Sequence, residues 1–591
     1  MNKITTPQFN PNELLENYFL QDYDRLSDKF IYVLEHFENQ TYFTLDNQAK
    51  YFIHVFLKNF LYFFTQPEYV IPDRHVARFI QLNLTISNLV AMSDFKTTDA
   101  YLEILKNQQR NFAKFLTLYS ARNSIKVDRK SIFDSNEQLA CLWYSCFCEI
   151  YRSGLVNQQA YNNIREHITY EDERLIDFYN IEDIYFGATY IDGDRDREVK
   201  QKINKAIQIS PFATAAQIKN TPDPKKIAII TSLWFSQHSV YRTLSEYVES
   251  LSEDYELTLI YLGPIKNNLD IGCFKAIKYV YFKDDGLNIG AIRENEFMAV
   301  YYPDIGMSSE SIFLSNLRIA PIQICGTGHP VSTFGSEIDY FISGAGVEIP
   351  EGAEENYSER LILLPGFGAI HNSPNYEIQN IEKTRSEFII NCSWFGQKVN
   401  YSQITYLQDI IKQSKKYILF RFFSGSALIR KNDFLPFVKD LQTLLGKERV
   451  EVIPPKSYEE YMDLMAEGDI SIDSYHFGGS NTITDSLYLR KPTVTYAGDK
   501  WYNRIGSQML RSAGLSELVA NNPEQYIKLI VRLINDDKYR ATIQDKVRKA
   551  DLNNTIFRSD SKRYFKKAID FLIKNHDKLK TETSRKPIRI Q

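Results

Sequence analysis

Residues 473–485 combine the residue types that bind phosphate and sugar groups. An apolar strand candidate runs into Gly478 and Gly479, and glycine allows a backbone to approach a ligand closely. A helix is expected to begin at Ser480, and the free N–H groups and positive dipole at a helix N-terminus form an anion site. Asp485, one turn into that helix, can accept hydrogen bonds from a ribose. The residues assigned to this candidate site are Gly478, Gly479, Ser480, Asn481, Thr482 and Asp485.

This arrangement favours a nucleotide diphosphate as the ligand, and a nucleotide sugar fits it best. The alternative is an ordinary strand–turn–helix connection with good capping residues and no ligand. The segment alone leaves both interpretations open.

Residues 236–243 follow the first strand candidate of the α/β region and contain His238. This histidine can act as a general base, or it can position a reacting hydroxyl or amide. Arg242 and Thr243 can stabilise developing negative charge, and Ser239 is assigned to the same substrate-binding segment. The alternative is a helix N-cap with a surface histidine.

Two further loops follow strand candidates. In residues 326–333, small residues such as Gly328 allow the loop to approach a sugar or phosphate, and His329 can donate a hydrogen bond to either. A Gly/Pro turn is the alternative there. Lys398 can reach a departing diphosphate as a point charge, and the alternative is a solvated surface lysine.

Asp192, Asp194 and Asp196 form an Asp-x-Asp pattern that can hold a metal–diphosphate complex. Such a site requires an alternating strand–helix unit around it, and none is predicted here. Because Arg195 and Arg197 are interleaved with the acids, a solvated turn that opens a helix is the simpler interpretation. No metal site is therefore expected.

The elements that must position these residues fall into two regions. Residues 1–208 are predicted to form an all-helical domain, because their apolar positions recur at helical spacing. No self-similarity indicates tetratricopeptide repeats, and residues 209–224 are expected to be a linker. The clearest helix candidates are residues 30–37, 48–64, 75–91 and 137–151.

In the second region, short β-branched runs alternate with helical segments, which indicates parallel sheets covered on both faces. A polar break at residues 371–386 divides this region into two doubly wound units, with a ligand cleft at the carboxyl ends of the strands. The predicted domains are 1–208, 225–375 and 386–575, followed by a basic tail at 576–591. The strand candidates are residues 226–233, 257–262, 277–282, 297–302, 321–325, 338–343, 388–393, 417–423, 450–454, 469–474 and 493–497.

The composition of the 591-residue chain, 43% hydrophobic and 24% charged, is ordinary for soluble globular domains. The net charge of −4 shows no bias toward nucleic acid or an anionic membrane. The first residues lack the apolar core of a signal peptide, and no apolar run is long enough to span a bilayer. The cysteines lack metal-ligand spacing, which favours core packing in a reducing cytoplasm. They are Cys141, Cys146, Cys148, Cys273, Cys325 and Cys392.

Together, these segments resemble the cytoplasmic bacterial N-glycosyltransferases that glucosylate high-molecular-weight adhesins, which are relatives of O-GlcNAc transferase. The resemblance implies a GT-B fold, in which two Rossmann-like domains are preceded by an all-α domain that is a candidate for acceptor recognition. It implies that Lys398 contacts the UDP diphosphate and that Asn481 and its neighbours bind the phosphates. It also implies that Asp485 binds the ribose and that His238 lies beside the acceptor and the transferred sugar. The matching segments are residues 238–243, 320–340, 397–400 and 477–485.

The chain departs from the family pattern at two positions. Thr482 stands where the family tends to have glycine, and Ser480 stands where O-GlcNAc transferases have histidine. These differences concern the donor sugar and the acceptor more than the fold.

The resemblance implies an inverting, metal-independent transfer of a hexose, expected to be glucose, from a UDP-sugar to asparagine side chains. The acceptor would be an adhesin or another surface protein, modified before export. No cofactor, nucleic-acid partner or membrane span is expected. Two alternatives stay open, namely protein O-glycosylation or extension of an attached sugar, and a non-catalytic scaffold. The general base is not identified.

Overall fold

The computed structural model describes residues 5–106, 111–147, 155, 157–266, 269–284, 286–379, 385–425, 433–558 and 560–591. It divides into two compact units, each assembled from segments that are separate in the sequence. The first unit contains Met1–Asp192, Asn391–Gln413 and Tyr417–Tyr458. The second contains Gly193–Ile390, Ser414–Lys416 and Glu459–Gln591.

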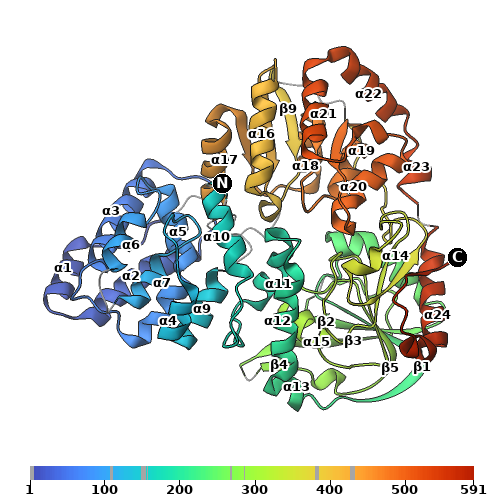
Figure 1. The fold of residues 1–591 in the computed structure, drawn as a ribbon, viewed down its shortest axis with the longest axis horizontal. Helices are drawn as coiled ribbons and strands as arrows, with labels where there is room; N and C mark the ends of the chain where they lie inside the picture. Colours follow the sequence, from blue (N-terminus) through green and yellow to red (C-terminus); the bar gives the residue numbers. More distant parts are fainter. Residues whose placement is uncertain are drawn as a thin grey trace. The chain divides into compact units, whose positions relative to one another are not determined.

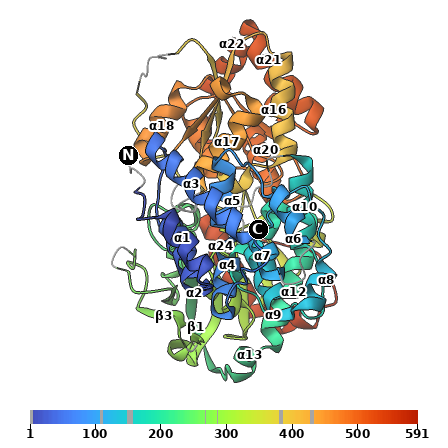
Figure 2. The same cartoon turned by 90° about the vertical axis from the view of Figure 1, so that its left-hand side faces the viewer.

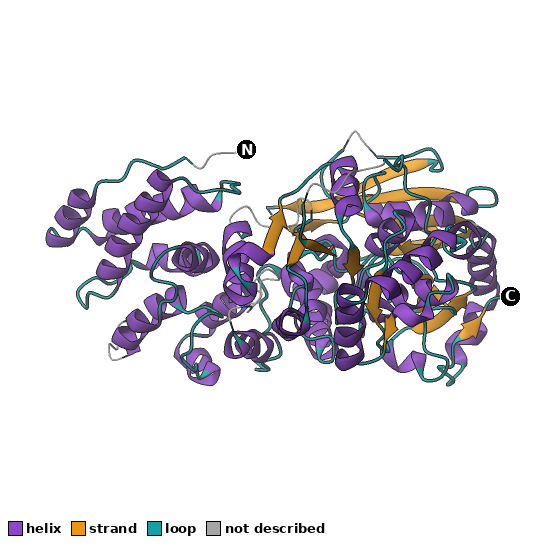
Figure 3. Ribbon diagram, turned by 90° about the horizontal axis from the view of Figure 1, so that it is seen from above, coloured by secondary structure: helices purple, strands orange, loops and turns teal. Residues whose placement is uncertain are grey.

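The N-terminal part of the first unit is helical, and its described residues contain no strand (Figures 1 and 3). Aromatic residues at helical spacing form its core, where Phe60 packs against Phe30 and Phe64 with ring centroids 5.1 and 4.4 Å apart. The second helix packs against the first and the fourth (Figure 2). The helices are α1 (Pro11–Phe19), α2 (Tyr23–Glu38), α3 (Asn47–Phe64), α4 (Asp73–Gln81), α5 (Asn83–Met92), α6 (Asp99–Lys106), α7 (Phe112–Leu118), α8 (Arg129–Ser135), α9 (Glu137–Phe147), α10 (Gln158–Ile168) and α11 (Ile181–Ile191).

Two of the predicted helices differ from the structure. The candidate at residues 75–91 is two helices, α4 and α5, separated at Leu82, where the backbone turns with φ −80° and ψ 1°. No glycine or proline marks this break, so the apolar pattern continues through it. The candidate at 137–151 is described as α9 up to Phe147, and residues 148–151, with Cys148, lie outside the described residues.

The first unit also contains a parallel strand pair and helices that cover it. Helix α17 of this part joins the N-terminal helices, because Lys439 Nζ donates to the Ala91 carbonyl oxygen (2.8 Å) and Arg122 pairs with Asp440 (2.5 Å). These contacts explain why residues 417–458 belong to the same compact unit as the helical domain. The elements are η3 (Gly396–Lys398), α16 (Tyr401–Gln413), β10 (Ile418–Phe423), α17 (Phe434–Leu445), η4 (Lys447–Arg449) and β11 (Val450–Ile453).

The second unit contains, within its described residues, a nine-stranded sheet in the order β15-β8-β7-β6-β5-β1-β2-β3-β4. Neighbouring strands in this sheet run parallel, except for β3 and β4, which are antiparallel. The order reverses between β1 and β5, and a ligand crevice is expected at the carboxyl ends of such neighbouring strands. The strands are β1 (Lys219–Thr231), β2 (Glu256–Leu262), β3 (Ala276–Lys283), β4 (Gly286–Asn288), β5 (Glu294–Tyr302), β6 (Ile322–Cys325), β7 (Tyr340–Gly344), β8 (Arg360–Leu364) and β15 (Ile588–Arg589).

Helices and short 3-10 turns accompany this sheet. They are α12 (Asp196–Ile209), α13 (Pro211–Ala215), α14 (Ser239–Leu251), η1 (Gly290–Ile292), α15 (Ser309–Ser315), η2 (Ala353–Asn356) and α24 (Lys562–Thr581). Residues 209–224, expected to be a linker, contain α13 and the beginning of β1. Strand β1 accommodates Pro222 and Pro224 because its pairing with β5 shifts register between Asn220 and Ile227.

A second sheet has the order β11-β10-β9-β12-β13-β14 in the described part of the chain, and the boundary between the two compact units runs through β9. Its pairs β10–β11, β12–β13 and β13–β14 are parallel. The all-α region followed by two parallel α/β sheets confirms the fold class predicted from the sequence. The remaining elements are β9 (Phe388–Cys392), α18 (Tyr458–Glu467), β12 (Ile470–Ile472), α19 (Asn481–Tyr488), β13 (Thr493–Tyr496), α20 (Trp501–Ser512), η5 (Ser516–Leu518), β14 (Val519–Ala520), α21 (Pro523–Asn535), α22 (Asp537–Lys549) and α23 (Leu552–Thr555).

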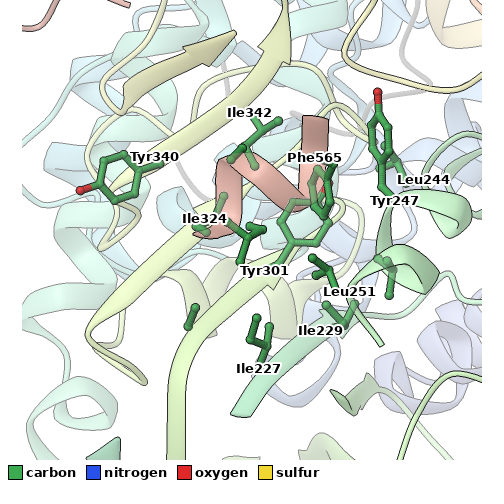
Figure 4. Packing of buried hydrophobic residues seen from close by; sticks show 14 of the residues in the cluster. Ile227, Ile229, Leu244, Tyr247, Leu251, Tyr301, Ile324, Tyr340, Ile342 and Phe565 are labelled. Atoms are coloured by element: carbon green, nitrogen blue, oxygen red, sulfur yellow. The ribbon is translucent and has the colours of Figure 1, made fainter. Parts of the chain in front are cut away.

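The C-terminal residues return to the first sheet. Phe565 of α24 stacks on Tyr247 of α14 (4.8 Å between centroids, 1° between planes) and meets Tyr301 of β5 edge-on at 5.1 Å (Figure 4). Strand β15 pairs with β8, with Ile588 opposite Ile362. Residues 562–575 were expected in the second α/β unit and 576–591 in a basic tail, whereas both segments complete the first sheet and its core.

Candidate active site

The loop between β12 and α19 is held by contacts within the second unit. The Gly479 N–H donates to Asp473 Oδ1 (2.7 Å), and the Gly478 N–H donates to the Tyr502 carbonyl oxygen (2.9 Å). A Cβ atom on Gly479 would lie 2.2 Å from Thr482 Oγ1, and one on Gly478 would lie 3.0 Å from Asp473 Oδ2. The two glycines are therefore required by the packing of the loop itself, a reason that is separate from close approach to a ligand.

The N-terminus of α19 is not capped by the side chain that precedes it. Ser480 makes no side-chain cap bond, and the first amides that bond back to its carbonyl oxygen are those of Ile483 and Thr484 (both 3.1 Å). The amides of Asn481 and Thr482 precede these bonds and point out of the helix end. The capped-connection alternative therefore does not describe this turn, and the geometry suits an anion.

Ser480 Oγ instead lies 2.7 Å from Nε2 of His371, a residue in the segment after β8. His371 is 2% exposed. Burial, and secondarily the charge of Arg242, lower the pKa of His371 to about 3. Sequence reasoning missed this residue, because it stands in the polar break at 371–386 outside any motif.

Two of the predicted constellations meet in the structure. Arg242, on α14, places its Nη2 atom 3.5 Å from Asp485 Oδ1 on α19. The Asp485 side chain is 4% exposed, whereas Arg242 is 28% exposed. The carboxylate is thus held at the start of α19 by a cation from the segment at residues 236–243.

His238 is the N-cap of α14. Its Nδ1 accepts a hydrogen bond from the Val240 N–H (3.2 Å), so the neutral ring carries its proton on Nε2. Burial, and secondarily the charge of Lys266, lower the pKa of His238 to about 4. An Nε2–H group donates hydrogen bonds, so this geometry favours a positioning role over a general base.

Ser239 and Thr243 stand in the same segment, residues 236–243. Ser239 is exposed at the first position of α14, and the Thr243 hydroxyl donates back to the Ser239 carbonyl oxygen (3.0 Å). The Thr243 carbonyl oxygen in turn accepts from the Ile370 N–H (3.0 Å), which ties α14 to the segment that carries His371.

The loop after β6 is braced internally. His329 Nδ1 lies 2.8 Å from the Ile305 carbonyl oxygen, which can only accept, so the ring donates there. Burial lowers the pKa of His329 well below its usual range and keeps the ring neutral. A Cβ atom on Gly328 would lie 2.5 Å from the Pro303 carbonyl oxygen. The packing and hydrogen bonds of the loop thus explain why glycine stands at 328 and histidine at 329. A neutral His329 adds no positive charge for a phosphate.

Lys398 belongs to the first unit, where it ends η3 and is half-buried. Its N–H donates to the Phe395 carbonyl oxygen (2.8 Å). It follows β9 directly, as predicted, and its role toward a diphosphate stays a prediction.

A buried acid also lies at the switch point of the first sheet. Asp304, just after β5, accepts a hydrogen bond from the Thr231 hydroxyl at the end of β1 (2.6 Å). Burial raises the pKa of Asp304 to about 7. No motif in the sequence marks this residue, since its partner lies in a different strand.

The wall of a cavity of about 280 Å³ includes Tyr502, whose carbonyl oxygen accepts the Gly478 N–H. Tyr502, in its wall, stacks on Phe477 with centroids 4.7 Å apart, and Lys500 donates to the Gly193 carbonyl oxygen. Its charged and aromatic lining suits a polar occupant. The lining residues are Asp194, Asp196, Arg197, Glu198, Pro330, Val331, Ser332, Phe334, Asn356, Tyr357, Lys500, Trp501 and Tyr502.

The acids of the Asp-x-Asp pattern do not all form a solvated turn. Asp194 is exposed, but Asp196, at the start of α12, is buried, and Asp192 in the first unit is buried and paired with Arg165 (2.8 Å). In the described part of the chain, no group of three or more His, Cys, Asp or Glu side chains gathers as a metal site would require. Nor does any described helix have the length and apolar character needed to cross a membrane.

Comparison with known proteins finds a family match in the C-terminal part of the chain. Residues 386–568 match the model of Glycosyl transferase family 41. This segment contains the open N-terminus of α19, Asp485 and Lys398.

Two curated relatives show what the chain is similar to. The UDP-glucose:protein N-beta-glucosyltransferase of Actinobacillus pleuropneumoniae serotype 5b (strain L20) is 24% identical over 540 residues, which cover 84% of this chain and 85% of the relative. A probable UDP-N-acetylglucosamine–peptide N-acetylglucosaminyltransferase SPINDLY of Oryza sativa subsp. japonica is 30% identical over 37% of this chain and 24% of its own length. The resemblance predicted from the sequence is confirmed.

One solved structure spans a similar share of the chain. A mutant of the O-GlcNAc transferase of Thermobaculum terrenum covers 84% of this chain and 97% of its own, with 17% identity and a TM-score of 0.49.

Proposed function

We propose that this protein is an inverting, metal-independent glycosyltransferase that moves glucose from UDP-glucose to asparagine side chains of proteins. Two observations support the proposal. A relative named for this activity aligns over 84% of the chain. The open N-terminus of α19, with Asp485 one turn inside it, has the chemistry to bind a nucleoside diphosphate.

The donor would bind with its diphosphate at the amides of Asn481 and Thr482 and at the Ser480 hydroxyl. Asp485, oriented by Arg242, would accept hydrogen bonds from the ribose. Lys398 would add a positive charge for the departing diphosphate. These groups stabilise the charge that develops on UDP as the bond to the anomeric carbon breaks, and they are oriented before the reaction begins.

The acceptor nitrogen would attack the anomeric carbon from the face opposite UDP, so that the C–N bond forms as the C–O bond to UDP breaks. The nitrogen then loses one proton to a base that the proposal leaves unassigned. His238 would donate its Nε2–H to the acceptor or the sugar and hold them in line. The helical domain is proposed to contribute to acceptor recognition.

Transfer is proposed to occur in the cytoplasm, before export of the acceptor. The free thiols Cys141, Cys273 and Cys325 support a reducing compartment.

A second candidate function is O-glycosylation with a UDP-N-acetylglucosamine donor. The specific observation in its favour is the 30% identity with the SPINDLY protein over 231 residues. A non-catalytic scaffold is a third possibility, and it predicts no binding of UDP.

Mass spectrometry of an Asn-x-Ser/Thr peptide incubated with the purified protein, a panel of UDP-sugars and EDTA tests the proposal. We expect a hexose mass shift on asparagine with UDP-glucose that EDTA does not abolish. A shift on serine or threonine would favour the second candidate. Absence of any shift, together with absence of UDP binding in calorimetry, would favour the scaffold.

A further inference from the structure

His371 is buried against the start of α19 without being part of any predicted motif. Its Nε2 atom contacts Ser480 Oγ at 2.7 Å, and its Nδ1 atom has no hydrogen-bond partner among the described residues. The ring meets Phe367 edge-on, with centroids 6.1 Å apart. The preceding amide, Ile370 N–H, donates to α14 (3.0 Å to the Thr243 carbonyl oxygen), so the segment is fixed on both sides.

The ring is neutral, and its environment selects the tautomer. Burial and the charge of Arg242 lower the pKa of His371 to about 3, so the ring carries one N–H at neutral pH. If that proton were on Nδ1, a buried donor would be left without a partner, which is among the costlier polar arrangements in proteins. With the proton on Nε2, the ring donates to Ser480 Oγ, and Nδ1 holds only a lone pair.

This direction of donation decides what Ser480 can do. A serine at an N-cap position ordinarily accepts a hydrogen bond from an amide of its own helix. Here its oxygen receives the His371 N–H, its side chain makes no cap bond, and the following eight-residue helix keeps its first amides open. The Ser480 hydroxyl proton is then available to donate outward.

We infer that His371 is a positioning residue that orients the Ser480 hydroxyl toward a phosphate oxygen of a nucleoside diphosphate bound at the N-terminus of α19. The inference rests on the proposed function, because it requires that a nucleoside diphosphate binds there. His371, in the segment after β8, thus acts on the ligand through Ser480. The same ring keeps the Ser480 side chain off the amides that would hold the anion.

Isothermal titration calorimetry with UDP and with uridine tests the inference on the full chain. His371→Phe keeps the ring's bulk but removes its N–H, and we expect it to weaken UDP binding about tenfold, the loss of one hydrogen bond to a charged ligand. Uridine binding should stay unchanged, because uridine has no phosphate. His371→Gln, whose amide can still donate, should recover part of the loss.

A double-mutant cycle separates positioning from general support of the fold. Ser480→Ala should weaken UDP binding to a similar extent, and adding His371→Phe to it should cause little further loss, because the imidazole acts through the serine. Additive losses, equal losses for UDP and uridine, or unchanged UDP affinity in His371→Phe would each overturn the inference. If His371→Phe does not fold, His371→Gln and Ser480→Ala carry the same comparison.

The two proposals fail in different ways. Wild-type protein that binds neither UDP nor uridine would overturn the proposed function, and the inference with it. Wild-type protein that binds UDP and transfers glucose, with His371→Phe at wild-type affinity, would overturn the inference alone.

Discussion

Three histidines of the second unit have protons whose positions are set by neighbouring groups. The Val240 amide occupies Nδ1 of His238, whereas the Ile305 carbonyl oxygen requires a proton on Nδ1 of His329. Burial lowers the pKa of both rings, and of His371, below the physiological range. These imidazoles are therefore hydrogen-bonding groups rather than cations at neutral pH. Positive charge for a departing diphosphate must come from the helix end and from lysine or arginine.

His238 provides a test of this distinction. His238→Asn should retain the cap of α14, because its side-chain oxygen can accept from the Val240 N–H. The shorter side chain should lose the hydrogen-bond donor at the position of Nε2. We expect transferase kcat to fall strongly in this variant while the melting temperature stays near wild type. His238→Ala should lose activity and also about 1 kcal/mol of stability, measured by urea denaturation.

The pH profile supplies the second readout. Because the pKa of His238 is lowered to about 4, its titration should produce no inflection in kcat between pH 6 and 8. An inflection in that range that disappears in His238→Asn would show that the residue exchanges a proton during turnover. That result would restore the general-base role.

At this scale the sequence identifies residues in motifs and misses residues defined by distant partners. His238, Asp485 and the two glycines are predicted as site residues because each stands in a short motif after a strand candidate. His371 acts on a serine 109 positions away, and Asp304 on Thr231 in another strand. Nothing local to either residue signals these contacts.

At the scale of elements, the loop between β12 and α19 depends on contacts that differ between its two glycines. Gly479→Ala would bring a Cβ within 2.2 Å of Thr482 Oγ1, and we expect it to cost about 1–3 kcal/mol in unfolding free energy. Thr482→Ala should relieve part of that cost in the double variant. Gly478→Ala is the matched control, because its Cβ would meet Asp473 and the Tyr502 backbone. Thr482→Ala should not rescue it, and additivity of Gly479→Ala with Thr482→Ala would contradict the packing argument.

The periodicity of the sequence predicted most central strands to within a few residues, since a strand buried on both faces is uniformly apolar. It missed β4, β14 and β15, which are two or three residues long. It also missed β8, and it joined α4 to α5. Short edge strands depend on pairing with a partner, and the break at Leu82 depends on packing, so neither leaves a local pattern.

At the scale of the whole molecule, the compact units do not follow the order of the chain. Residues 417–458 join the N-terminal helices through Lys439 and Arg122. Helix α24 adds Phe565, Ala568, Ile569 and Leu572 to the core of the first sheet. A domain boundary predicted from composition cannot show that a later segment packs against an earlier domain, because the apolar face of α24 would suit either sheet.

The return of α24 predicts a long-range effect on stability. Phe565 is fully buried between Tyr247 and Tyr301, so Phe565→Ala should cost about 3–5 kcal/mol of unfolding free energy. Hydrogen exchange should rise in β1, β5 and β6, although these strands lie more than two hundred residues earlier in the sequence. Exchange in β12 and β13 should change less. Lys574→Ala, on the exposed side of the same helix, is the control and should leave both regions unchanged. If exchange rose in β12 and β13 instead, α24 would stabilise the second sheet, as the domain predicted at residues 386–575 implies.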